Sequence, residues 1–582
     1  MPDRFPEQQT LTLQKDLNLA VQYYTAGELP KAEGICEQIL QTDPNHPDAL
    51  HLLGVINHQV GKNDQAVDLI TKAIDLNPNY AEAHCNLGLA LHELRRLDEA
   101  MANYHKAIDI KPNFSEAYYN LGNALKELGQ LEEAVASYHK ALAINSGYVE
   151  AHANLGNVNR KLGLLDEAVA SYNHATAIKP DFAEVHYNLG NTLKELGQLD
   201  EAIASYLKAL DIVPHFAEAL CNLGVAFKKL GKLNEAVTSY HKALAIKPDF
   251  AEVHNNLGNS LQELGRLEEA VSHYRKAIDI NPDYAEAHYN LGNSLMVHGR
   301  VEEAIVHYHE ALASNPDFAE AHYNLHTLLI DPYDMAPSIK CMQRAVDINP
   351  SRTDYRFFLG MLLDYGGNPH EAAAHFYFVE KGTSSDHAKL DAWRHIKSAR
   401  KPMPQIIGST IEAFKLGIDA ALNDGLVLEF GVRFGTSIRQ IAGLVKQDVH
   451  GFDSFQGLPE AWHHEPKGSY STKGAIPAVQ ENVILHQGWF EETLPIFIEK
   501  HQTPVRFMNI DCDIYSSTKI VLDLLANQII PGTVIVFDEY IGNENWRQDE
   551  FKAFQETVLK YGWNYEYLCF SFMTKQVVVR IH

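Results

Sequence analysis

The stretch AEAHCNLGLALHELRRLDEAMANYHKAIDIKPNF, residues 81–114, contains two segments with helical patterning and a proline near its end. In AEAHCNLGLALHEL and in LDEAMANYHKAIDI, apolar residues recur at intervals of three and four, as on one face of an α-helix. The pair Arg95–Arg96 separates the segments, and Pro112 stops the second because a helix cannot continue through proline. Gly88 and Ala100 are small enough to let the two helices pack closely. The stretch therefore predicts a helix–turn–helix unit.

The unit recurs every 34 residues, and three residue series keep this register. The glycines of the first helix are Gly54, Gly88, Gly122, Gly156, Gly190, Gly224, Gly258 and Gly292. The alanines of the second helix are Ala66, Ala100, Ala134, Ala168, Ala202, Ala236, Ala270 and Ala304. The prolines that follow are Pro44, Pro78, Pro112, Pro180, Pro214, Pro248, Pro282, Pro316 and Pro350. One helix pair cannot bury its apolar face alone, so neighbouring pairs must stack.

This period and pattern resemble the tetratricopeptide repeat. The resemblance implies an α-solenoid, a tetratricopeptide superhelix of about eleven units over residues 13–386, after an N-terminal tail at residues 1–12. The first, tenth and eleventh units are degenerate, and in the tenth His326 replaces the glycine. Atypical end units are typical of caps on a repeat array.

A fourth series is not needed for helix packing: an asparagine stands two residues before the repeat glycine. Its members are Asn86, Asn120, Asn154, Asn188, Asn222, Asn256, Asn290 and, before His326, Asn324. The series resembles the asparagine ladder of O-GlcNAc transferase repeats, in which side-chain amides bind an extended peptide backbone. An amide both donates and accepts hydrogen bonds, as a peptide unit does. The resemblance implies a groove for a protein or extended peptide; alternatively, asparagine is a tolerated consensus residue and the array is a plain scaffold.

Charge and composition exclude several classes of partner. The 582 residues carry a net charge of -26, whereas nucleic-acid binding needs a basic face. The N-terminus shows no basic segment followed by an apolar stretch, so no signal peptide is predicted. No apolar run approaches the ~20 residues of a membrane span. We therefore expect a cytoplasmic protein that binds no nucleic acid and has no membrane span.

The repeat pattern fades after Phe376, and a mixed, more basic stretch at residues 387–408 is interpreted as a linker. From residue 409 to 582, helical stretches alternate with short apolar runs. Candidate strands are Leu426–Phe430, Val449–Asp453, Val483–His486, Val505–Ile510, Thr533–Phe537, Glu566–Phe570 and Gln576–Ile581. Alternation of strands and helices predicts an α/β, Rossmann-like domain with a parallel sheet and helices on both faces.

The first long strand ends in a glycine-rich turn, EFGVRFGTS, from Glu429 through Gly431 and Gly435 to Ser437. Glycines let a ligand approach the backbone at the carboxyl end of a strand. The spacing resembles the first motif of class I S-adenosylmethionine methyltransferases, which implies that these four residues bind the cofactor. Asp453, at the end of the second strand, can accept hydrogen bonds from both ribose hydroxyls. The alternative is an ordinary strand–turn–helix joint.

Four further motifs follow in order: GFDSFQGLPE at 451–460, GWFEETLP at 488–495, NIDCDIYSST at 509–518 and PGTVIVFDEY at 531–540. With the glycine-rich turn, they resemble the macrocin O-methyltransferase family, which methylates sugar hydroxyls. The resemblance covers residues 409–582 and implies an S-adenosylmethionine-dependent O-methyltransferase acting on a glycan or another hydroxyl acceptor.

Two pairs of acids end neighbouring candidate strands: Asp511 with Asp513, and Asp538 with Glu539. Four converging carboxylates repel one another, and Mg²⁺, which prefers oxygen ligands, would resolve the repulsion. Alternatively, some of them are exposed turn residues or helix caps. The family resemblance implies that Asp511, Asp538 and Glu539 are metal ligands and that Asp513 is the general base. Glu539 departs from relatives that carry two consecutive aspartates.

In this hypothesis a metal lowers the pKa of the acceptor hydroxyl, the Asp513 carboxylate removes the proton, and the oxygen attacks the sulfonium methyl group. The repeat array would recruit the substrate or a partner. Two alternatives stay open: an interaction scaffold with a catalytically inactive methyltransferase fold, and a protein methyltransferase that holds its substrate in the repeat groove.

Overall fold

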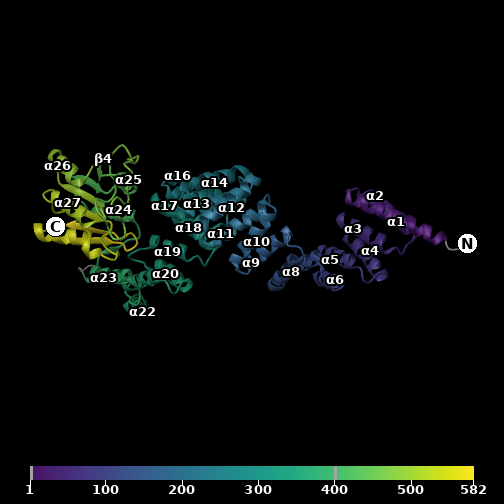
Figure 1. Cartoon of the computed structure of the whole chain (residues 1–582). Helices are drawn as coiled ribbons and strands as arrows, with labels where there is room; N and C mark the ends of the chain where they lie inside the picture. Colours follow the sequence, from purple (N-terminus) through teal and green to yellow (C-terminus); the bar gives the residue numbers. More distant parts are fainter. Residues whose placement is uncertain (1–3, 399–402) are drawn as a thin grey trace. The chain divides into compact units, whose positions relative to one another are not determined.

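The structure, a computed structural model, describes residues 4–398 and 403–582. The chain divides into two compact units, Met1–Pro248 and Asp249–His582. Helices follow one another through the purple, blue and teal parts of the chain before strands appear near the C-terminus (Figure 1). The predicted fold class is confirmed: a tetratricopeptide solenoid is followed by an α/β region with a mostly parallel sheet.

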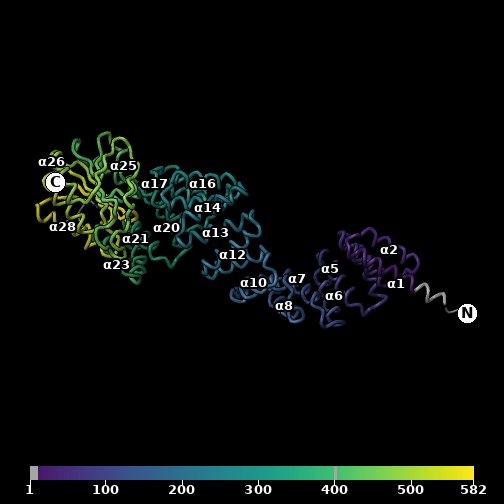
Figure 2. Tube along the Cα trace, turned by 45° about the horizontal axis from the view of Figure 1, so that its top comes forward, coloured from purple at the N-terminus to yellow at the C-terminus, as the bar shows by residue number. Residues whose placement is uncertain are grey.

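Fourteen helices make up the described part of the first unit, and Figure 2 shows consecutive helices running back and forth. They are α1 (Arg4–Thr25), α2 (Leu29–Thr42), α3 (Pro47–Gln59), α4 (Asn63–Leu76), α5 (Ala81–Glu93), α6 (Leu97–Ile110), α7 (Ser115–Glu127), α8 (Leu131–Ile144), α9 (Val149–Lys161), α10 (Leu165–Ile178), α11 (Ala183–Glu195), α12 (Leu199–Ile212), α13 (Ala217–Lys229) and α14 (Leu233–Ile246). Of the expected tail at residues 1–12, residues 4–12 belong to α1, and residues 1–3 lie outside the described residues.

The repeat glycine has a packing role that the pair α5 and α6 illustrates. A Cβ atom on Gly88 would lie 2.5 Å from the ring of Tyr104, so no larger residue fits against that ring. Tyr104 itself is fully buried in α6, beside the buried Ala100. The turn between the two helices needs a left-handed residue, which is Arg95 here (φ 61°) and glycine in most other units. A glycine–tyrosine contact of this kind recurs in the helix pairs of Gly88, Gly122, Gly156, Gly190, Gly224, Gly258 and Gly292.

The second unit begins with nine more helices. They are α15 (Ala251–Glu263), α16 (Leu267–Ile280), α17 (Ala285–Val297), α18 (Val301–Ser314), α19 (Ala319–Leu328), α20 (Ala336–Ile348), α21 (Thr353–Tyr365), α22 (Pro369–Val379) and α23 (Ser384–Ser398). Within the described residues, α1 to α22 form eleven helix pairs. In the tenth pair, His326 is fully buried where other units have glycine, and its ring centroid lies 5.7 Å from that of Phe358.

The remaining elements form an α/β region. Its helices are α24 (Thr410–Ala420), α25 (Thr436–Leu444), α26 (Phe490–Lys500), α27 (Tyr515–Leu524), the 3₁₀ helix η1 (Trp546–Gln548) and α28 (Glu550–Tyr561). Its strands are β1 (Gln405–Ile406), β2 (Leu426–Phe430), β3 (Val449–Asp453), β4 (Val483–Gln487), β5 (Val505–Ile510), β6 (Val534–Phe537), β7 (Tyr565–Phe570) and β8 (Val577–Ile581).

The eight strands form one sheet in the order β1-β7-β8-β6-β5-β2-β3-β4. All neighbours pair in parallel except β8, which is antiparallel to both β6 and β7. Residues of β2 alternate between two apolar cores: Val427 joins the core under α24 and α25, whereas Leu428 joins the core that includes residues of α26, α27 and α28. Helices therefore cover both faces of the sheet, as predicted from the alternation of strands and helices.

The stretch predicted as a linker, residues 387–408, contributes to the packed structure. Most of α23 lies in it, and the short strand β1 extends the sheet before residue 409; residues 399–402 lie outside the described residues. Trp393 of α23 is buried, and its ring centroid lies 6.0 Å from that of Phe570 in β7. Phe357 of α21 makes an edge contact with Phe572 at 5.1 Å. The last repeats and the sheet thus share one hydrophobic core.

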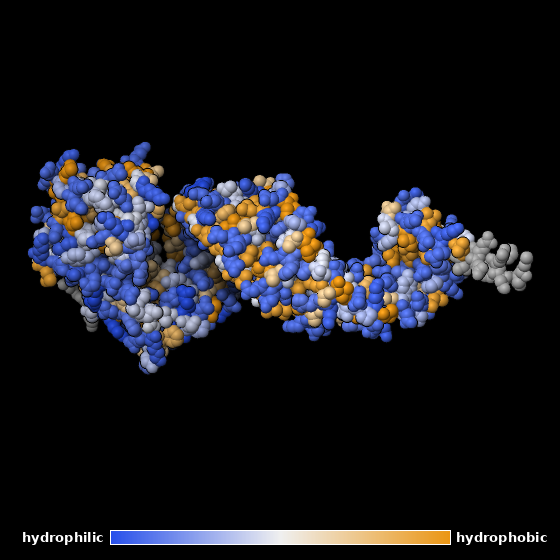
Figure 3. Space-filling view, in the orientation of Figure 1, coloured by the Kyte–Doolittle hydropathy of each residue, from blue (hydrophilic) through white to orange (hydrophobic). Residues whose placement is uncertain are grey.

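On the face shown in Figure 3, hydrophilic residues predominate, and hydrophobic residues lie among them in patches over the repeat helices. Across residues 4–398 and 403–582, none of the helices combines the length and the apolar character that crossing a membrane requires.

Candidate functional site

A cavity of about 620 Å³ opens in the α/β region of the second unit. The cavity lies at the carboxyl ends of five parallel strands, β2 to β6. Each of these strands ends in, or is directly followed by, a residue that lines the cavity. These residues are Gly431 after β2, Asp453 in β3, Gly488 after β4, Asp511 after β5 and Asp538 after β6. In open α/β sheets, ligands bind at the carboxyl ends of the strands. This cavity is therefore the candidate site.

The glycine-rich turn forms one wall of the cavity. Gly431 has a φ of 92°, and a Cβ atom there would lie 1.8 Å from the carbonyl oxygen of Asp511. Gly435, with a φ of 76°, begins α25. Neither position tolerates a side chain without strain, which explains the two glycines of the turn. Gly431 lines the cavity, whereas Gly435 is not among its lining residues.

Glu429 and Ser437, which were also predicted to bind the cofactor, contact each other instead of lining the cavity. The Glu429 carboxylate is fully buried and accepts hydrogen bonds from the Ser437 hydroxyl and from the side-chain amide of Asn509, the latter at 3.2 Å. Burial raises the pKa of Glu429 to about 8. The structure thus places these two residues as supports of the β2–α25 turn, and their contact with a cofactor stays a prediction.

Asp453 lies at the end of β3 with its carboxylate held by backbone N–H groups. Its Oδ2 accepts a hydrogen bond of 2.7 Å from Arg433 N, and its Oδ1 accepts one of 2.5 Å from Phe455 N. Each carboxylate oxygen has a second lone pair, so the group can still accept from two hydroxyls of a ribose. Asp453 lines the cavity next to Gly431, as the sequence predicted for a nucleoside site.

All four predicted acids of β5 and β6 line the cavity. Burial, together with Asp538 and Asp513, raises the pKa of Asp511 well above its usual range. Burial and the nearby Glu539 raise the pKa of Asp538 to about 6 and that of Asp513 to about 7. The four side chains therefore do converge, as expected from strands that end at the same edge.

Sequence reasoning missed the groups that surround these acids. Lys575 Nζ lies 3.0 Å from each carboxylate oxygen of Glu539, and the side-chain amide of Gln576 donates to Asp538. A fifth acid, Glu550 at the start of α28, is fully buried and accepts a hydrogen bond of 3.2 Å from the backbone of Glu539. No local motif marks these residues, because they come from the β7–β8 hairpin and from α28.

This arrangement does not fit the Mg²⁺ ion expected at Asp511, Asp538 and Glu539. In the part of the chain that the structure describes, no group of three or more His, Cys, Asp or Glu side chains is arranged to hold a metal ion. The Glu539 carboxylate is instead paired with the ammonium group of Lys575. An ammonium group at this position repels a divalent cation. We therefore derive no step of the reaction through a metal.

Aromatic side chains also line the cavity. Trp462 and Tyr470 come from the long segment between β3 and β4, and Trp489 and Phe490 come from the start of α26. The guanidinium group of Arg433 lies 4.8 Å from the centroid of the Tyr470 ring. The cavity therefore combines flat apolar walls with a strongly polar floor, as ligand sites commonly do.

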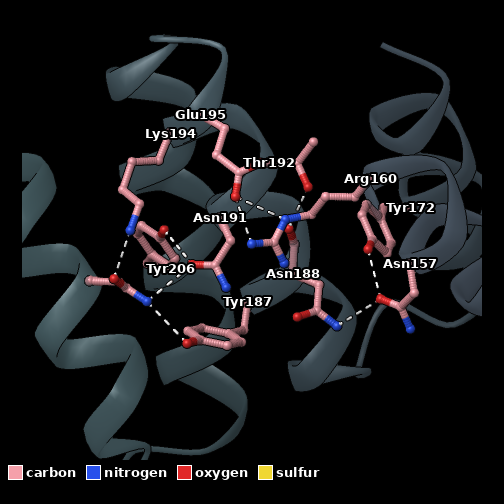
Figure 4. Close-up of polar contacts among 11 residues, drawn as sticks. Asn157, Arg160, Tyr172, Tyr187, Asn188, Asn191, Thr192, Lys194, Glu195 and Tyr206 are labelled. Carbon is pink, nitrogen blue, oxygen red and sulfur yellow. Dashed lines mark hydrogen bonds and ion pairs between the residues drawn. The ribbon is translucent and has the colours of Figure 1, made fainter. Parts of the chain in front are cut away.

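The predicted groove asparagines lie in a hydrogen-bond network that Figure 4 shows around α11. The Tyr206 hydroxyl donates to Asn191 Oδ1 at 2.8 Å, and Asn222 Nδ2 of the next repeat donates to the same oxygen at 3.1 Å. Asn222 Nδ2 also lies 3.0 Å from the hydroxyl oxygen of Tyr187, and Lys194 Nζ donates to Asn222 Oδ1 at 2.8 Å. A ladder asparagine thus uses its amide nitrogen to join its repeat to the preceding one.

The pattern extends along the array. Ladder asparagines with amide nitrogens that donate within the described residues are Asn86 (to His51), Asn120 (to Cys85), Asn154 (to Tyr119 and Asn123), Asn188 (to Asn157), Asn290 (to Asn255) and Asn324 (to Tyr289 and Asn293). Asn256 holds the same position in α15. A second series, which sequence reasoning missed, accepts from the buried tyrosines: Asn123, Asn157, Asn191, Asn259 and Asn293. The asparagines therefore have a structural role: one series joins neighbouring repeats, and the other accepts hydrogen bonds from the buried tyrosines.

Comparisons with known proteins agree with this two-part architecture. Residues 56–329 match the family description "TPR repeat" in eight overlapping segments, and residues 428–540 match the description "Methyltransferase domain". The chain thus carries a tetratricopeptide-repeat array and a methyltransferase domain. A methyltransferase domain of this kind implies S-adenosylmethionine as the cofactor. No curated protein matches the chain.

Several solved structures are similar to parts of the chain, with TM-scores below 0.5. The crystal structure of YrrB, "a TPR protein with an unusual peptide-binding site", is 28% identical over 32% of this chain and 95% of its own, with a TM-score of 0.30. MamA 41-end from Desulfovibrio magneticus RS-1 is 20% identical over 29% of this chain and 96% of its own, with a TM-score of 0.28. The APC/C hetero-tetramer Cut9-Hcn1 is 14% identical over 60% of this chain and 96% of that chain, with a TM-score of 0.33.

Proposed function

We propose that the chain is an S-adenosylmethionine-dependent O-methyltransferase with a repeat array that recruits a protein or an extended peptide segment. The observation that carries the proposal is the cavity itself, which is lined by Gly431, Asp453 and Asp513. Gly431 exposes backbone to the cavity, and Asp453 keeps lone pairs for ribose hydroxyls. These residues fit the cofactor, which supplies the activated methyl group when bound.

Asp513 is the proposed general base. Its carboxyl group lines the cavity, and burial with the nearby Glu539 raises its pKa to about 7. A base with a pKa near the working pH combines a useful fraction of the carboxylate form with a strong pull on the proton. The Asp513 carboxylate would take the proton of the acceptor hydroxyl as the hydroxyl oxygen bonds to the methyl carbon and the bond between that carbon and the cofactor's sulfur breaks. Proton transfer of this kind contributes about 10²–10⁴-fold to a rate.

The acceptor class follows from the walls of the cavity. Trp462, Tyr470 and Trp489 present aromatic surfaces, and Asp513, Ser516 and Glu460 present hydrogen-bonding groups. A sugar ring has C–H faces that pack on aromatic rings and hydroxyls that bond to acids. This combination supports a glycan or another polyhydroxyl acceptor, in line with the family resemblance in the sequence. The net charge of -26 keeps nucleic acid outside the proposal.

For the repeat array, the proposed ligand contacts are the carbonyl oxygens of the ladder asparagines. In the first unit, Oδ1 of Asn154 and Oδ1 of Asn188, which belong to successive repeats, accept no hydrogen bond from the residues that the structure describes. Successive repeats present these oxygens at equivalent positions, and the backbone N–H groups of an extended segment are matching donors. Tetratricopeptide arrays bind peptides or proteins in general, so the array would bring a partner or substrate to the enzyme.

Calorimetric titration of S-adenosylmethionine into the full chain tests the enzyme. We expect saturable binding to the wild type and a loss of about tenfold or more in Asp453→Ala, since hydrogen bonds to a charged group contribute about 1.5–3 kcal/mol each. Asp448→Ala is the matched control, because Asp448 lies exposed just before the opposite end of the same strand. Failure of the wild type to bind the cofactor would leave an interaction scaffold with an inactive fold.

Radiolabelled methyl transfer then separates the two enzymatic hypotheses. Label that enters small glycans or glycosylated products in the presence of the wild type, and not of Asp513→Asn, supports the O-methyltransferase. Label that enters protein side chains instead identifies a protein methyltransferase and contradicts the proposed acceptor class.

A further inference from the structure

The tip of the β7–β8 hairpin, residues 571–576, is built as a rigid turn beside the cavity. Ser571 N donates to Gln576 O at 2.8 Å, and Thr574 Oγ1 donates to Gln576 Oε1 at 2.8 Å. Lys575 has a φ of 57°, and its carbonyl oxygen accepts a hydrogen bond of 3.3 Å from Ile541 N. These bonds fix the direction of two side chains that the turn carries, those of Lys575 and Gln576.

Both side chains reach the acid pair at the end of β6. Lys575 Nζ makes a symmetric contact with Glu539, at 3.0 Å to each oxygen. The buried Gln576 donates through its amide to Asp538 Oδ1. The hairpin tip thus provides partners for two of the three carboxylates expected to bind a divalent ion. Glu539 receives a positive charge from Lys575, and Asp538 receives a neutral hydrogen-bond donor from Gln576.

The site is closed to a cation for two physical reasons. Each Glu539 oxygen already has an ammonium hydrogen-bond donor, and a charge-assisted pair of this kind is strong. A divalent ion at Glu539 would also meet the ammonium charge at contact distance, where repulsion in a partly buried site is large. The side chain of Glu539 is 17% exposed and that of Lys575 is 42% exposed, so water screens the repulsion only in part.

We propose that Lys575 supplies, in this protein, the positive charge that a bound divalent cation supplies in metal-dependent O-methyltransferases. The proposal rests on the proposed function, since it concerns the same cavity. Lys575 is a positioning residue: it holds Glu539 and keeps one positive charge among the acids beside the acceptor. Cofactor binding by this protein then requires no divalent metal. Removal of the lysine charge frees the Glu539 carboxylate to turn toward Asp511 and Asp538 and bind a cation with them.

The test is Mn²⁺ binding to the full chain after dialysis against EDTA, followed by electron paramagnetic resonance of the free ion. We expect the wild type and Lys575→Arg to bind no Mn²⁺ saturably. Lys575→Met keeps the length of the side chain without its charge, and we expect its Mn²⁺ affinity to rise about tenfold or more. Adding Asp538→Asn to Lys575→Met should remove that gain. Lys560→Met, which removes an exposed lysine paired with Asp523 elsewhere, is the control and should behave like the wild type.

Titration of S-adenosylmethionine into the same samples separates the failure of this inference from the failure of the proposed function. Saturable Mn²⁺ binding by the wild type that Asp538→Asn abolishes would overturn the inference, whether or not the cofactor binds. A Lys575→Met variant that binds the cofactor but gains no Mn²⁺ affinity would overturn it as well. Absence of cofactor binding in every sample would contradict the proposed function, while the Mn²⁺ comparison would still report on Lys575.

Discussion

Replacement of Glu429 by glutamine is expected to stabilise the methyltransferase region, and increasingly so as the pH rises. Glu429 is wholly buried in β2, and its Oε2 has no hydrogen-bond partner in the described residues. Burial raises its pKa to about 8 from an ordinary value near 4.5. Glutamine keeps the size of the side chain and an oxygen that accepts from Ser437 and Asn509, but it never carries the charge.

The sign of the effect follows from proton binding. Between about pH 4.5 and pH 8, the folded state keeps the Glu429 proton and the unfolded state loses it, so the free energy of unfolding falls as the pH rises. The full stability is present below the unfolded pKa and is lost as the pH rises to the folded pKa. With these two values, the Glu429→Gln variant should exceed the wild type by about 2 kcal/mol at pH 6 and by about 4–5 kcal/mol at pH 8.5.

Tryptophan fluorescence during urea unfolding measures the stability of the second compact unit, which contains Glu429. All five tryptophans lie between residues 393 and 563, so the signal follows the second unit and not the first. Glu481→Gln is the control, because Glu481 is exposed in the same region and should change the midpoint little at either pH. A Glu429→Gln midpoint that exceeds the wild type equally at both pH values, or falls below it at pH 8.5, would refute the reasoning.

Three further predictions concern packing. Gly190→Ala should destabilise the first unit by about 1–3 kcal/mol, because the new Cβ atom would lie 2.6 Å from the Tyr206 ring. Gly34→Ala is the control: its Cβ atom would have no atom within 4 Å, so it should stabilise the unit by up to about 1 kcal/mol. Thermal melting followed by circular dichroism compares the two variants. Asn191→Ala removes the acceptor of two donors and should cost about 1–3 kcal/mol for each donor left buried; a melting temperature equal to that of the wild type would count against the network. Trp393→Ala should cost about 3–5 kcal/mol in the urea midpoint of the second unit and weaken cofactor binding, and an unchanged midpoint would mean that α23 does not stabilise the sheet.

Local features of the sequence were sufficient for the elements themselves. The strand expected at Leu426–Phe430 has those bounds in the structure, and the helix expected before Pro112 ends at Ile110. Periodicity, helix-stopping prolines and glycine turns act over a few residues, so each can be read without knowledge of the rest of the chain. The two-residue strand β1 carries no such pattern, and the sequence did not predict it.

The candidate site was predictable to the extent that topology dictates it. Parallel strands place their carboxyl ends at one edge, which brings Asp453, Asp511, Asp513 and Asp538 to one cavity. Topology does not show which way each side chain points, and Glu429 proved to lie beneath the cavity wall and not in it. The role of the ladder asparagines was likewise open, because their hydrogen bonds join different repeats.

The sequence by itself therefore determined the helix pairs, most of the strands of the α/β region and the edge at which its acids gather. Only the tertiary structure decided how those acids are neutralised. Lys575 is 36 residues from Glu539 along the chain, and it meets Glu539 because β8 runs antiparallel beside β6 and the hairpin turn directs the lysine inward. Pairing of charges depends on distances between distant segments, and no local pattern in the sequence encodes those distances.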